Sequence, residues 1–550
     1  MAKSKKKISF TFKPGFSIGA VDAEHDPLLE ECFIATSCYN QISNINDPHC
    51  GIIGRSGTGK TAILRLLIKN LPIVAEIRPD ALAFQFLSSS EMMMALRNSH
   101  IDIDYFYKLL WRHVFVVEIL KAGFPKEARR SGLIRKAIAR IKKSSVPDKE
   151  RDRAIKYLDE WGGSILQAPQ ERVINIHNEL EKRLRAKLGT GSWPNILAPE
   201  ANIEGEIVTK REESEQVRIV KDEINKIQVQ DLNAVKQYLN TDILTDLRKP
   251  IFVVIDDLDR FWIEEPLVYD LIRALMLEIY DWADVKNVKI VYVLRDNILE
   301  KIESEFTTRS YQREKIDDQR IRLRWNNIEL TNLIERRLAA ISEREKYKYT
   351  HLNELLPSKT GGQVSGKEYI FNRSLDRPRD IIDFFNKAAA ESTLQTSISW
   401  KNLFAAEEAY SLGRLRSLFD EWEANCPGID LLVNILRGGP PHFPLTWFSE
   451  DDIERIFSNP KLPEEGWLSK CYREFTFTYT KNKTAAISTC RKELLKILYE
   501  IGLVGVKTST SGSYRYAHKM QPILSDSDFE NDLEIAVHPA YHKTLGLKQF

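Results

Sequence analysis

The chain has 550 residues, of which 43% are hydrophobic and 29% charged, so its composition supports folded cores and its length predicts about three or four domains. The 80 lysines and arginines nearly balance the 78 aspartates and glutamates, and a net charge of +2 neither favours nor excludes a polyanionic partner. The six cysteines show no C-x-x-C pairing, and no apolar run approaches the roughly 20 residues that span a bilayer, so we expect a cytoplasmic protein with free thiols and no membrane role.

A glycine-rich segment near the start of the chain predicts a phosphate-binding loop. It reads Gly54-Arg55-Ser56-Gly57-Thr58-Gly59-Lys60-Thr61, a spacing that lets successive backbone N–H groups turn inward around a polyphosphate. We expect a strand over 50–53 to enter the loop and a helix over 62–70 to leave it. Lys60 would then reach the β- and γ-phosphates of ATP, and the Thr61 hydroxyl would be a ligand of Mg²⁺.

The next segment, 88–249, has a helical and charged pattern that is too long for one crossover connection, so it predicts a helical insertion. One part of it is a basic amphipathic helix with Arg129, Arg130, Arg135, Lys136, Arg140, Lys142 and Lys143. This helix either contacts nucleic-acid phosphates or presents a solvated face. Another part has the spacing of a short coiled-coil seam at Val217, Val220, Ile224 and Ile227, which a helical hairpin explains as well as a partner-binding arm.

An apolar, β-branched run at 251–255 ends abruptly in Asp256 and Asp257. Such a run predicts a buried central strand of a parallel sheet. Open α/β sheets bind their ligands at the carboxyl ends of the strands, so Asp256 would hold Mg²⁺ and Asp257 would polarise the water that attacks the nucleotide. The alternative is a strand followed by a solvated acidic turn.

A further apolar strand is expected over 288–294, followed by Arg295 and Asp296. In P-loop ATPases of the additional-strand type, the strand after the acidic one carries a polar residue that senses the γ-phosphate. Arg295 or Asp296 has the position for this role. Equally, Arg295 could be the partner of a nearby carboxylate.

The segment Arg377-Pro378-Arg379-Asp380 leads into an apolar periodic stretch over 381–390. Proline is well tolerated at the first position of a helix, so Arg379 would lie on the first turn and could neutralise phosphate charge from a lid domain. The alternative is a solvated helix start in which Arg379 pairs with Asp380 on the surface. The upstream Thr360-Gly361-Gly362-Gln363 follows the acidic strand, the wrong order for an ABC signature, and is read as a surface loop.

The C-terminal region predicts helices over 412–424, 429–436 and 491–501, with Gly502 as a helix stop. Two strands, 503–507 and 514–518, flank a Ser/Thr-rich loop in the manner of a hairpin. Helix followed by hairpin is the order of a winged helix. Such a domain would bind DNA or pack internally as a brake, and the balanced charge of the last helix favours packing.

The residues Ile255-Asp256-Asp257-Leu258-Asp259-Arg260-Phe261 resemble the STAND and KAP branch of P-loop NTPases. Further motifs resemble a bacterial group of standalone P-loop ATPases: Asp22-Ala23-Glu24-His25-Asp26, Tyr107-Lys108-Leu109-Leu110-Trp111-Arg112-His113-Val114, Val293-Leu294-Arg295-Asp296-Asn297-Ile298, Leu323-Arg324-Trp325 with Leu330 and Arg336-Arg337, Arg377-Pro378-Arg379-Asp380, and Val537-His538-Pro539-Ala540. Many KAP proteins carry transmembrane helices within the ATPase domain, and this sequence has none.

The resemblance implies an ATP-hydrolysing molecular switch that controls a partner or effector, often in bacterial antiphage systems. It implies an α/β P-loop NTPase core of the additional-strand type, with a parallel sheet, a large helical insertion, a helical lid and a C-terminal winged-helix-like region. The expected segments are 1–87 (N-terminal segment and first part of the core), 88–249 (insertion), 250–310 (second part of the core), 311–398 (lid) and 399–550 (winged-helix-like region).

Two other functions stay open at this stage. The chain could be a nucleic-acid-binding protein regulated by ATP, through the basic helix and the winged-helix order. It could also be a nucleotide-dependent homo-oligomeric scaffold in which Arg260, Arg336 or Arg337 completes a neighbour's site. The sequence indicates neither the trigger and effector nor a preference for ATP over GTP.

Overall fold

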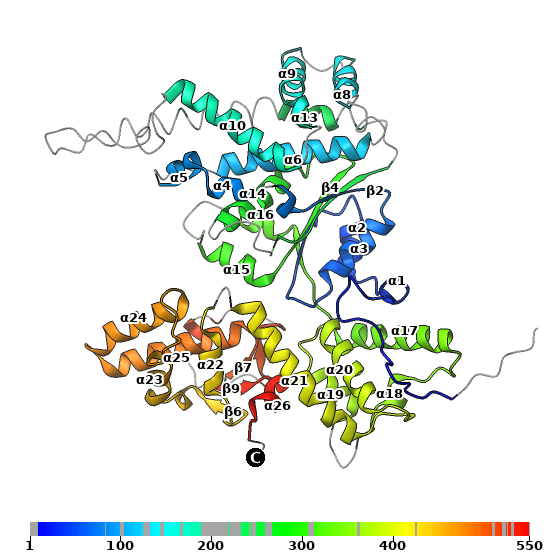
Figure 1. Ribbon diagram of the computed structural model, residues 1–550, viewed down its shortest axis with the longest axis vertical. Helices are drawn as coiled ribbons and strands as arrows, with labels where there is room; N and C mark the ends of the chain where they lie inside the picture. Colours follow the sequence, from blue (N-terminus) through cyan, green and yellow to red (C-terminus); the bar gives the residue numbers. More distant parts are fainter. Residues whose placement is uncertain are drawn as a thin grey trace, which may run out of the picture. The chain divides into compact units, whose positions relative to one another are not determined.

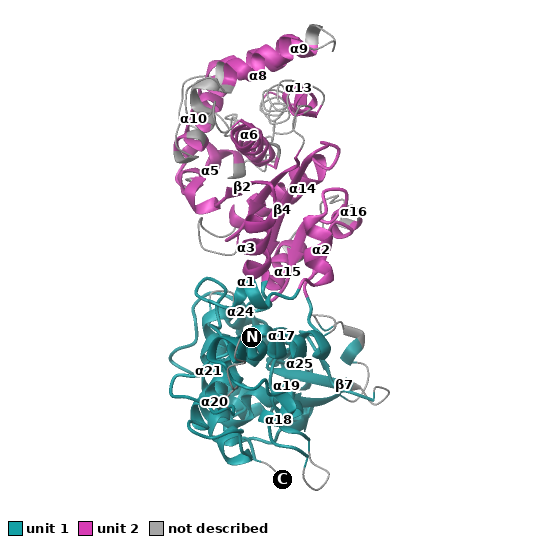
Figure 2. Cartoon of the chain, turned by 90° about the vertical axis from the view of Figure 1, so that its right-hand side faces the viewer, with its two compact units in different colours: residues 1–34, 56–59, 324–550 teal, residues 35–55, 60–323 magenta. Residues whose placement is uncertain are grey.

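The computed structural model describes residues 9–82, 84–98, 104–124, 133–143, 148–165, 169–188, 219, 233–240, 244, 249–258, 267–305, 313–359, 364–423, 426–508, 512–519, 524, 526–529 and 533–548. The chain forms two compact units (Figure 2). The sheet unit contains Ala35–Arg55 and Lys60–Leu323, and the C-terminal unit contains Met1–Ile34, Ser56–Gly59 and Arg324–Phe550. The glycine-rich segment therefore belongs to both units, with its tip in the C-terminal unit.

The sheet unit alternates strands with helices. Its elements are α2 (Ser37–Ser43), β1 (Gly51–Ile53), α3 (Lys60–Asn70), β2 (Ile73–Ile77), η1 (Pro79–Leu82), α4 (Gln85–Ser88), α5 (Glu91–Asn98), α6 (Asp104–Gly123), α8 (Leu133–Lys142), α9 (Asp148–Ile165), α10 (Pro169–Leu188), α13 (Asn233–Tyr238), β3 (Ile251–Ile255), α14 (Leu267–Asp281), β4 (Val288–Leu294), α15 (Asp296–Glu305), α16 (Arg313–Asp317) and β5 (Arg320–Arg322).

The core of the sheet unit is a five-stranded parallel sheet in the order β2-β3-β4-β1-β5. Every residue of β1, β3 and β4 is buried, which is why these strands are apolar on both faces instead of alternating, apart from Lys289 in β4, whose Nζ donates to the carbonyls of Gln41, Asn44 and Asp47. The predicted strands over 50–53, 251–255 and 288–294 are confirmed as β1, β3 and β4, and the predicted parallel α/β sheet is confirmed with them. In the sheet, β4 lies between β1 and β3.

Helices cover both faces of this sheet (Figure 1). The chain passes from β1 through α3 to β2 in one direction across the sheet, and from β3 through α14 to β4 in the opposite direction. Because parallel crossover connections are right-handed, helices on opposite paths lie on opposite faces. The helix α3 packs with α2, whereas α14 packs with α6, and α6 also contacts β2 and β3.

The helix α6 lies inside the predicted insertion, yet it is part of the core of the sheet unit. Its residues join α14 and the sheet strands in one hydrophobic cluster. A buried ion pair fixes its position: Arg112 Nε lies 2.5 Å from Glu278 Oε1 and Arg112 Nη2 lies 2.7 Å from Oε2, so the pair is bidentate. Burial raises the pKa of Glu278, although the Arg112 charge acts against this rise.

The C-terminal unit combines a helical bundle with a second sheet. Its elements are α1 (Leu29–Cys32), α17 (Asn327–Glu345), α18 (Leu352–Leu355), α19 (Gly366–Asn372), α20 (Pro378–Glu391), α21 (Trp400–Trp422), α22 (Ile429–Ile435), β6 (His442–Pro444), η4 (Leu445–Trp447), α23 (Glu450–Phe457), α24 (Trp467–Tyr479), α25 (Lys483–Glu500), β7 (Val504–Thr508), β8 (Arg515–Tyr516), η5 (Asp526–Phe529), β9 (Leu533–Val537), η6 (Pro539–Tyr541) and α26 (His542–Leu545).

The long helix α21 connects the two parts of this unit, because it packs on α20 in the bundle and on α22, η6 and α26 after it. The second sheet has the order β6-β9-β7-β8, and its paired strands are antiparallel. The predicted hairpin is confirmed: Gly505 pairs with Tyr516, and Val506 with Arg515. The predicted stop is confirmed as well, since Gly502 follows α25 with φ +80°.

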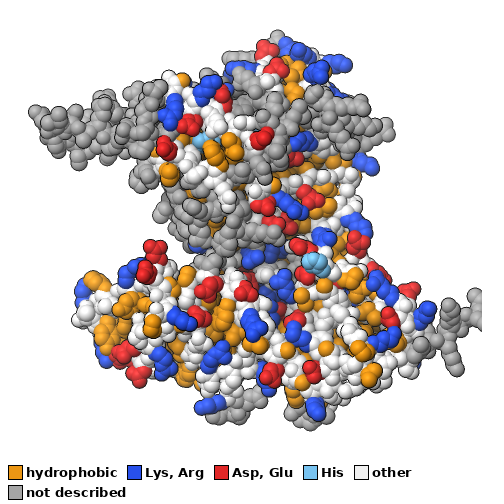
Figure 3. Space-filling view, viewed as in Figure 1, with side chains coloured by type: hydrophobic (Ala, Val, Ile, Leu, Met, Phe, Trp, Pro, Cys, Tyr) orange, Lys and Arg blue, Asp and Glu red, His pale blue; other side chains and the backbone are white. Residues whose placement is uncertain are grey.

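The described surface carries both signs of charge. On the face seen in Figure 3, acidic and basic side chains are interspersed among hydrophobic and uncharged polar ones, in keeping with the small net charge. Within the described ranges, no helix combines the length and the apolar character that a membrane crossing requires.

The Arg112–Glu278 pair generates a stability prediction. Replacing Glu278 with Leu removes the bidentate partner of the buried guanidinium and leaves it Asp281 at 3.3 Å and Asn233 at 2.6 Å, so we expect a loss of about 3–5 kcal/mol. The double variant Arg112→Met/Glu278→Leu removes both charges and should be clearly more stable than the single variant. Urea unfolding of the three proteins measures this order; a double variant that is less stable than Glu278→Leu would contradict it.

Candidate functional site

The carboxyl ends of three neighbouring strands bring the predicted residues of the sheet unit to one edge. Ile53 at the end of β1 pairs with Leu294 at the end of β4, and Ile255 at the end of β3 pairs with Tyr292. The Gly54 N–H donates to the Leu294 carbonyl at 3.1 Å, which fixes the start of the glycine-rich loop to β4. The loop, the acidic pair and Arg295 therefore all leave the sheet at the same edge.

Lys60 begins the helix α3, two residues before the predicted start at 62. Its Nζ donates to the carbonyls of Gly54 at 2.7 Å and Arg55 at 3.1 Å, so the ammonium group is held over the start of the loop. Lys60 and Thr61 are both half-buried. The first turn of α3 therefore presents an ammonium and a hydroxyl beside the positive end of a helix dipole.

Asp256 and Asp257 follow β3 directly, and both are half-buried. The Asp257 N–H donates to Asp256 Oδ1 at 2.8 Å. Asp257 has φ +59°, a left-handed conformation that costs about 1–2 kcal/mol in a residue with a side chain. The turn after β3 thus holds strain at the sheet edge, where strained residues commonly belong to functional sites.

The two alternatives for the γ-phosphate sensor differ in their surroundings. Asp296 begins α15, and its Oδ1 lies 2.7 Å from Nη1 of Arg322 at the end of β5. Arg295 lies between β4 and α15 and is half-buried. Asp296 thus has a cationic partner within its own unit, and the sensor role of either residue stays a prediction.

The tip of the loop, Ser56–Gly59, is bound by the rest of the C-terminal unit through its carbonyl groups. Arg377 Nη1 donates to the Ser56 carbonyl at 2.7 Å, and Trp325 Nε1 donates to the Thr58 carbonyl at 2.7 Å. Between them, the Arg379 N–H makes a longer contact of 3.4 Å with the Gly57 carbonyl. Three successive carbonyls of the loop therefore point toward one set of donors.

This arrangement also orients the N–H groups of the loop. In a planar trans peptide, the C=O of one residue and the N–H of the next point in opposite directions. Because the carbonyls of Ser56, Gly57 and Thr58 face Arg377, Arg379 and Trp325, the three N–H groups that follow them point away from these donors.

Arg379 lies against the tip of the loop. Its Nη1 donates to the Ser56 hydroxyl at 2.9 Å. Gly57 has φ +78°, and a Cβ at this position would lie 3.0 Å from both Cβ and Cδ of Arg379, so only glycine fits here. Among the described residues, Arg379 forms no ion pair with a carboxylate, and burial together with the charges of Arg377 and Arg414 lowers its pKa. A half-buried guanidinium in this position favours an anionic ligand.

A buried charge cluster holds the first turn of α20 in place. Asp380 is fully buried, and its carboxylate lies 2.9 Å from Arg377 Nε and 3.3 Å from Arg414 Nη1. Burial alone would raise the pKa of Asp380, but the charges of Arg377 and Arg414 hold it at about 2. The alternative surface pair between Arg379 and Asp380 is wrong, because Asp380 faces the core and Arg379 faces the loop. The expected proline at the first position of this helix is confirmed.

The sequence did not identify all residues that contact the loop. Trp325 and Arg377 occurred in family patterns without an assigned role, and nothing in the sequence pointed to Glu421, whose Oε1 accepts from the Ser56 N–H at 3.4 Å. Their only local signal is their place at helix ends: Trp325 and Arg377 precede α17 and α20, and Glu421 lies in the last turn of α21.

Arg336 and Arg337, two of the arginines considered for completing a neighbour's site, have partners within this chain. Arg337 is buried, and its Nη2 lies 2.6 Å from Oδ2 of Asp26, a residue of the 22–26 motif. Arg336 Nη1 donates to the Phe33 carbonyl at 2.8 Å. Both arginines thus attach the N-terminal segment to α17. Arg260 lies outside the described residues.

Two of the basic side chains of the predicted basic helix have a packing role. In α8, Lys136 Nζ and the Arg140 guanidinium lie 5.0 and 4.9 Å from the centre of the Phe124 ring, so both cations stack on an aromatic face. Arg129, Arg130, the four residues of the coiled-coil seam and the loop over 360–363 lie outside the described residues. Within the described residues, no group of three His, Cys, Asp or Glu side chains is arranged to hold a metal ion.

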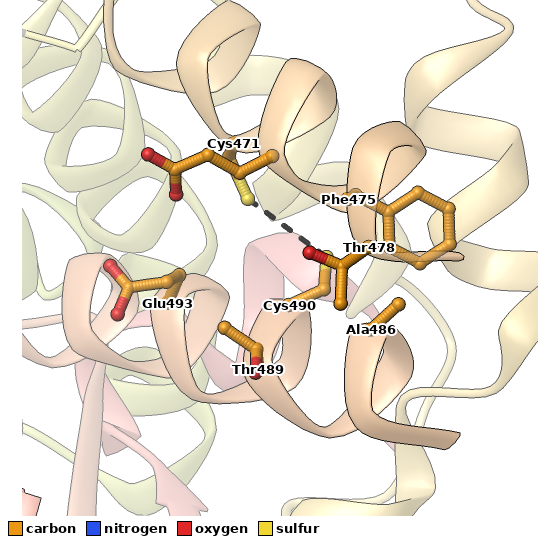
Figure 4. Close-up of a pocket in the computed structure, with 8 residues that line it drawn as sticks. Cys471, Phe475, Thr478, Ala486, Thr489, Cys490 and Glu493 are labelled. Carbon is orange, nitrogen blue, oxygen red and sulfur yellow. Dashed lines mark hydrogen bonds between the residues drawn. The ribbon is translucent and has the colours of Figure 1, made fainter. Parts of the chain in front are cut away.

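A separate cavity of about 210 Å³ lies in the C-terminal unit, between α24 and α25 (Figure 4). It is lined by Cys471, Glu474, Phe475, Thr478, Ala486, Thr489, Cys490 and Glu493. The Sγ atoms of Cys471 and Cys490 lie 3.9 Å apart. Hydrogen bonding with Cys471 and burial raise the pKa of the Cys490 thiol, so this thiol is a weak nucleophile at neutral pH. All six cysteines are free, as expected, and none of the predicted site residues lines this cavity.

Comparison with known proteins finds a match to one domain family and a distant similarity to one protein. Residues 328–419 match the FunZ-associated C-terminal helical domain, a range that contains Arg377, Arg379, Asp380 and Arg414. Over 543 residues, the chain is 21% identical to a protein of Escherichia coli (strain K12) named as an 80.3 kDa protein of transposon gamma-delta, an alignment that covers 96% of this chain and 67% of that protein. The charge cluster of α20 and α21 thus lies in the segment that resembles a family of helical domains.

The Asp380 cluster predicts a pH dependence of stability. A carboxyl with pKa about 2 in the folded chain and an ordinary value near 3.8 when unfolded stabilises the fold above pH 4 and loses this contribution as the pH falls toward 2. Asp380→Asn should therefore be strongly destabilised at pH 7, and its deficit relative to the natural chain should shrink below about pH 4. Thermal unfolding from pH 7 to pH 3 tests this; a deficit that stays constant would contradict it.

Proposed function

We propose that this protein is a P-loop ATPase that binds ATP with Mg²⁺, hydrolyses it, and uses the nucleotide state as a molecular switch. The observation that carries the proposal is the orientation of the loop tip, whose carbonyls are bound by Arg377, Arg379 and Trp325. Their peptide planes leave the N–H groups facing the opposite side, which suits a polyphosphate. The proposal agrees with the resemblance of the sequence to the KAP and STAND branch of P-loop NTPases.

The residues around the loop fit a triphosphate. Gly57 and Gly59 both have positive φ, at +78° and +98°, which suits a tight loop with no side chain on its concave side. Lys60 supplies an ammonium at the start of α3, where the helix dipole also favours an anion. Arg379 supplies a second cation at the tip, and a phosphate would be the anionic partner that its guanidinium does not have among the described carboxylates.

The donor set also fits Mg²⁺, which prefers oxygen ligands and usually keeps several waters when it binds a nucleotide. We assign the Thr61 hydroxyl and the Asp256 carboxylate as its protein ligands. When bound, the ion would neutralise phosphate charge during the reaction. Asp257 is the group that would orient and polarise the attacking water, and the left-handed turn after β3 sets its position.

The order of the strands supports the additional-strand type of P-loop ATPase. In this type one strand separates the strand before the phosphate loop from the acidic strand, and β4 has this place between β1 and β3. Arg295 at the end of β4 is then the candidate sensor of the γ-phosphate. The candidate sensor and the acidic pair lie in the sheet unit, and the tip of the loop is bound by the C-terminal unit.

We infer that the output of the switch runs through the C-terminal unit, since its residues contact the loop directly. A protein partner or effector would read the conformation of this unit. Antiphage defence is the biological context that the resemblance suggests, and a winged-helix role for α25, β7 and β8 belongs to the same proposal.

The first test is ATP binding by Lys60→Ala. The ammonium would make charge-assisted hydrogen bonds to phosphate, so its loss should weaken binding about 10- to 150-fold, the equivalent of about 1.5–3 kcal/mol. Lys69→Ala, at the exposed end of the same helix, is the matched control and should bind ATP normally. Calorimetric titration with ATP and Mg²⁺ measures both; equal affinity in Lys60→Ala and the natural chain would remove the proposed site.

The second test separates binding from hydrolysis. Asp257→Asn keeps the shape of the side chain but removes the charge that polarises water, so we expect ATP affinity to stay within a few-fold while phosphate release slows by about 10²- to 10⁴-fold. Asp284→Asn, an exposed residue of the sheet unit, should hydrolyse ATP at the natural rate. Unchanged phosphate release in Asp257→Asn would exclude its proposed role.

A further inference from the structure

One residue just after the C-terminal hairpin contacts two short segments, 324–325 and 376–377, that also bind the glycine-rich loop. This residue is Lys519, three positions after β8. Arg324 Nη1 donates to the Lys519 carbonyl at 2.9 Å, and Lys519 Nζ lies 3.3 Å from Asp376 Oδ2. The ring of His518, which is almost fully buried, lies 3.9 Å from the same carboxylate oxygen.

The next residue along the chain from each of these partners contacts the loop. Trp325 follows Arg324 and donates to the Thr58 carbonyl, whereas Arg377 follows Asp376 and donates to the Ser56 carbonyl. Each connection between the hairpin and the loop is therefore two residues long. A change in the orientation of the loop carbonyls must move the side chain of Trp325 or Arg377, or else break a hydrogen bond of 2.7 Å.

The connection through Asp376 is fixed by the backbone as well. Asp376 has φ +51°, a left-handed conformation that a residue with a side chain holds only when its surroundings impose it. On one side the Leu375 N–H donates to buried Asp380 at 3.0 Å, and on the other side Arg377 belongs to the charge cluster. The backbone of 375–377 is therefore held on both sides, and a displacement of Arg377 would also displace Asp376.

The hairpin forms one edge of its sheet. The strand β8 is the edge strand of the order β6-β9-β7-β8, and among the described residues it pairs with β7 at two positions, whereas β7 pairs with β9 at five. Edge segments with few hydrogen bonds open at lower free energy than the strands beside them. A small force on Lys519 would thus move β8 before it moved the rest of the sheet.

We propose that Arg324 and Asp376 are positioning residues that couple the nucleotide state of the phosphate loop to the β7–β8 hairpin through Lys519. The inference rests on the proposed function, because it needs a nucleotide at the loop. The coupling acts in both directions: a partner that holds the hairpin changes the affinity of the loop for nucleotide by the same factor by which nucleotide changes the affinity for that partner.

The test is hydrogen–deuterium exchange of the full chain with Mg²⁺ and adenylyl imidodiphosphate, a nonhydrolysable ATP analogue. In the natural chain, the analogue should change exchange both in the loop, 54–61, and in β7 and β8. In Arg324→Gln/Lys519→Met, the loop should still respond while the response of β7 and β8 falls to less than about half. The analogue affinity of this variant should shift about 5-fold, the lower range of allosteric coupling.

Two further variants make the result specific. Lys507→Met removes an ion pair of β7 with Glu534, 3.8 Å apart, without touching the connection, and should respond like the natural chain. Asp376→Asn removes the charge that faces Lys519 and His518 but keeps the bond from Arg324 to the Lys519 carbonyl, so it should show a partial loss, which keeps the test decisive if the double variant does not fold. A merely structural role for Lys519 would lower stability and leave the hairpin response intact.

The outcomes distinguish the coupling from the proposed nucleotide binding. If the analogue alters exchange in the loop but not in β7 and β8 of the natural chain, the coupling is refuted and the proposed function stands. If the loop itself does not respond at saturating analogue, both fail. A hairpin response that survives in Arg324→Gln/Lys519→Met refutes the assigned residues.

Discussion

The proposed site depends on one constraint in the glycine-rich loop: the carbonyls of Ser56 and Thr58 face Arg377 and Trp325. Peptide planarity means that donors bound to the carbonyls of Ser56 and Thr58 decide where the following N–H groups point. A glycine-rich loop on its own has many conformations, and Gly57 and Gly59 make this freedom large. The side chains of Arg377 and Trp325 select one of them. Arg377 in turn is held by the buried Asp380, so one of the two donors to the loop is set from the core of the C-terminal unit.

Much of the sheet was predictable, because its central strands are buried on both faces. The run over 251–255 is continuously apolar and the run over 288–294 is apolar except for Lys289, and burial on both faces makes such runs visible in a sequence. The edge strands gave no comparable signal: β2 has exposed and half-buried positions, and β5 has three residues with two arginines among them. The helix α6 was assigned to an insertion because its place on the sheet depends on contacts with α14, more than 140 residues later.

The candidate site was predictable only where residues follow strands or begin helices. Lys60, Asp256 and Arg295 could be placed by this rule, since the carboxyl ends of parallel strands share one edge. The partners of the loop tip could not, because Trp325, Arg377 and Glu421 lie more than 260 residues away from it along the chain. The left-handed backbone of Asp257 was also hidden, because an aspartate after a strand is equally common in an ordinary turn.

The most direct measurement is a crystal structure with Mg²⁺ and a nonhydrolysable ATP analogue. The account predicts phosphate oxygens within hydrogen-bond distance of the N–H groups of 57–61, with Arg379 facing the terminal phosphate. It predicts that the carbonyls of Ser56 and Thr58 keep Arg377 and Trp325 as donors. A nucleotide bound away from the loop, or loop carbonyls turned toward the phosphates, would contradict it.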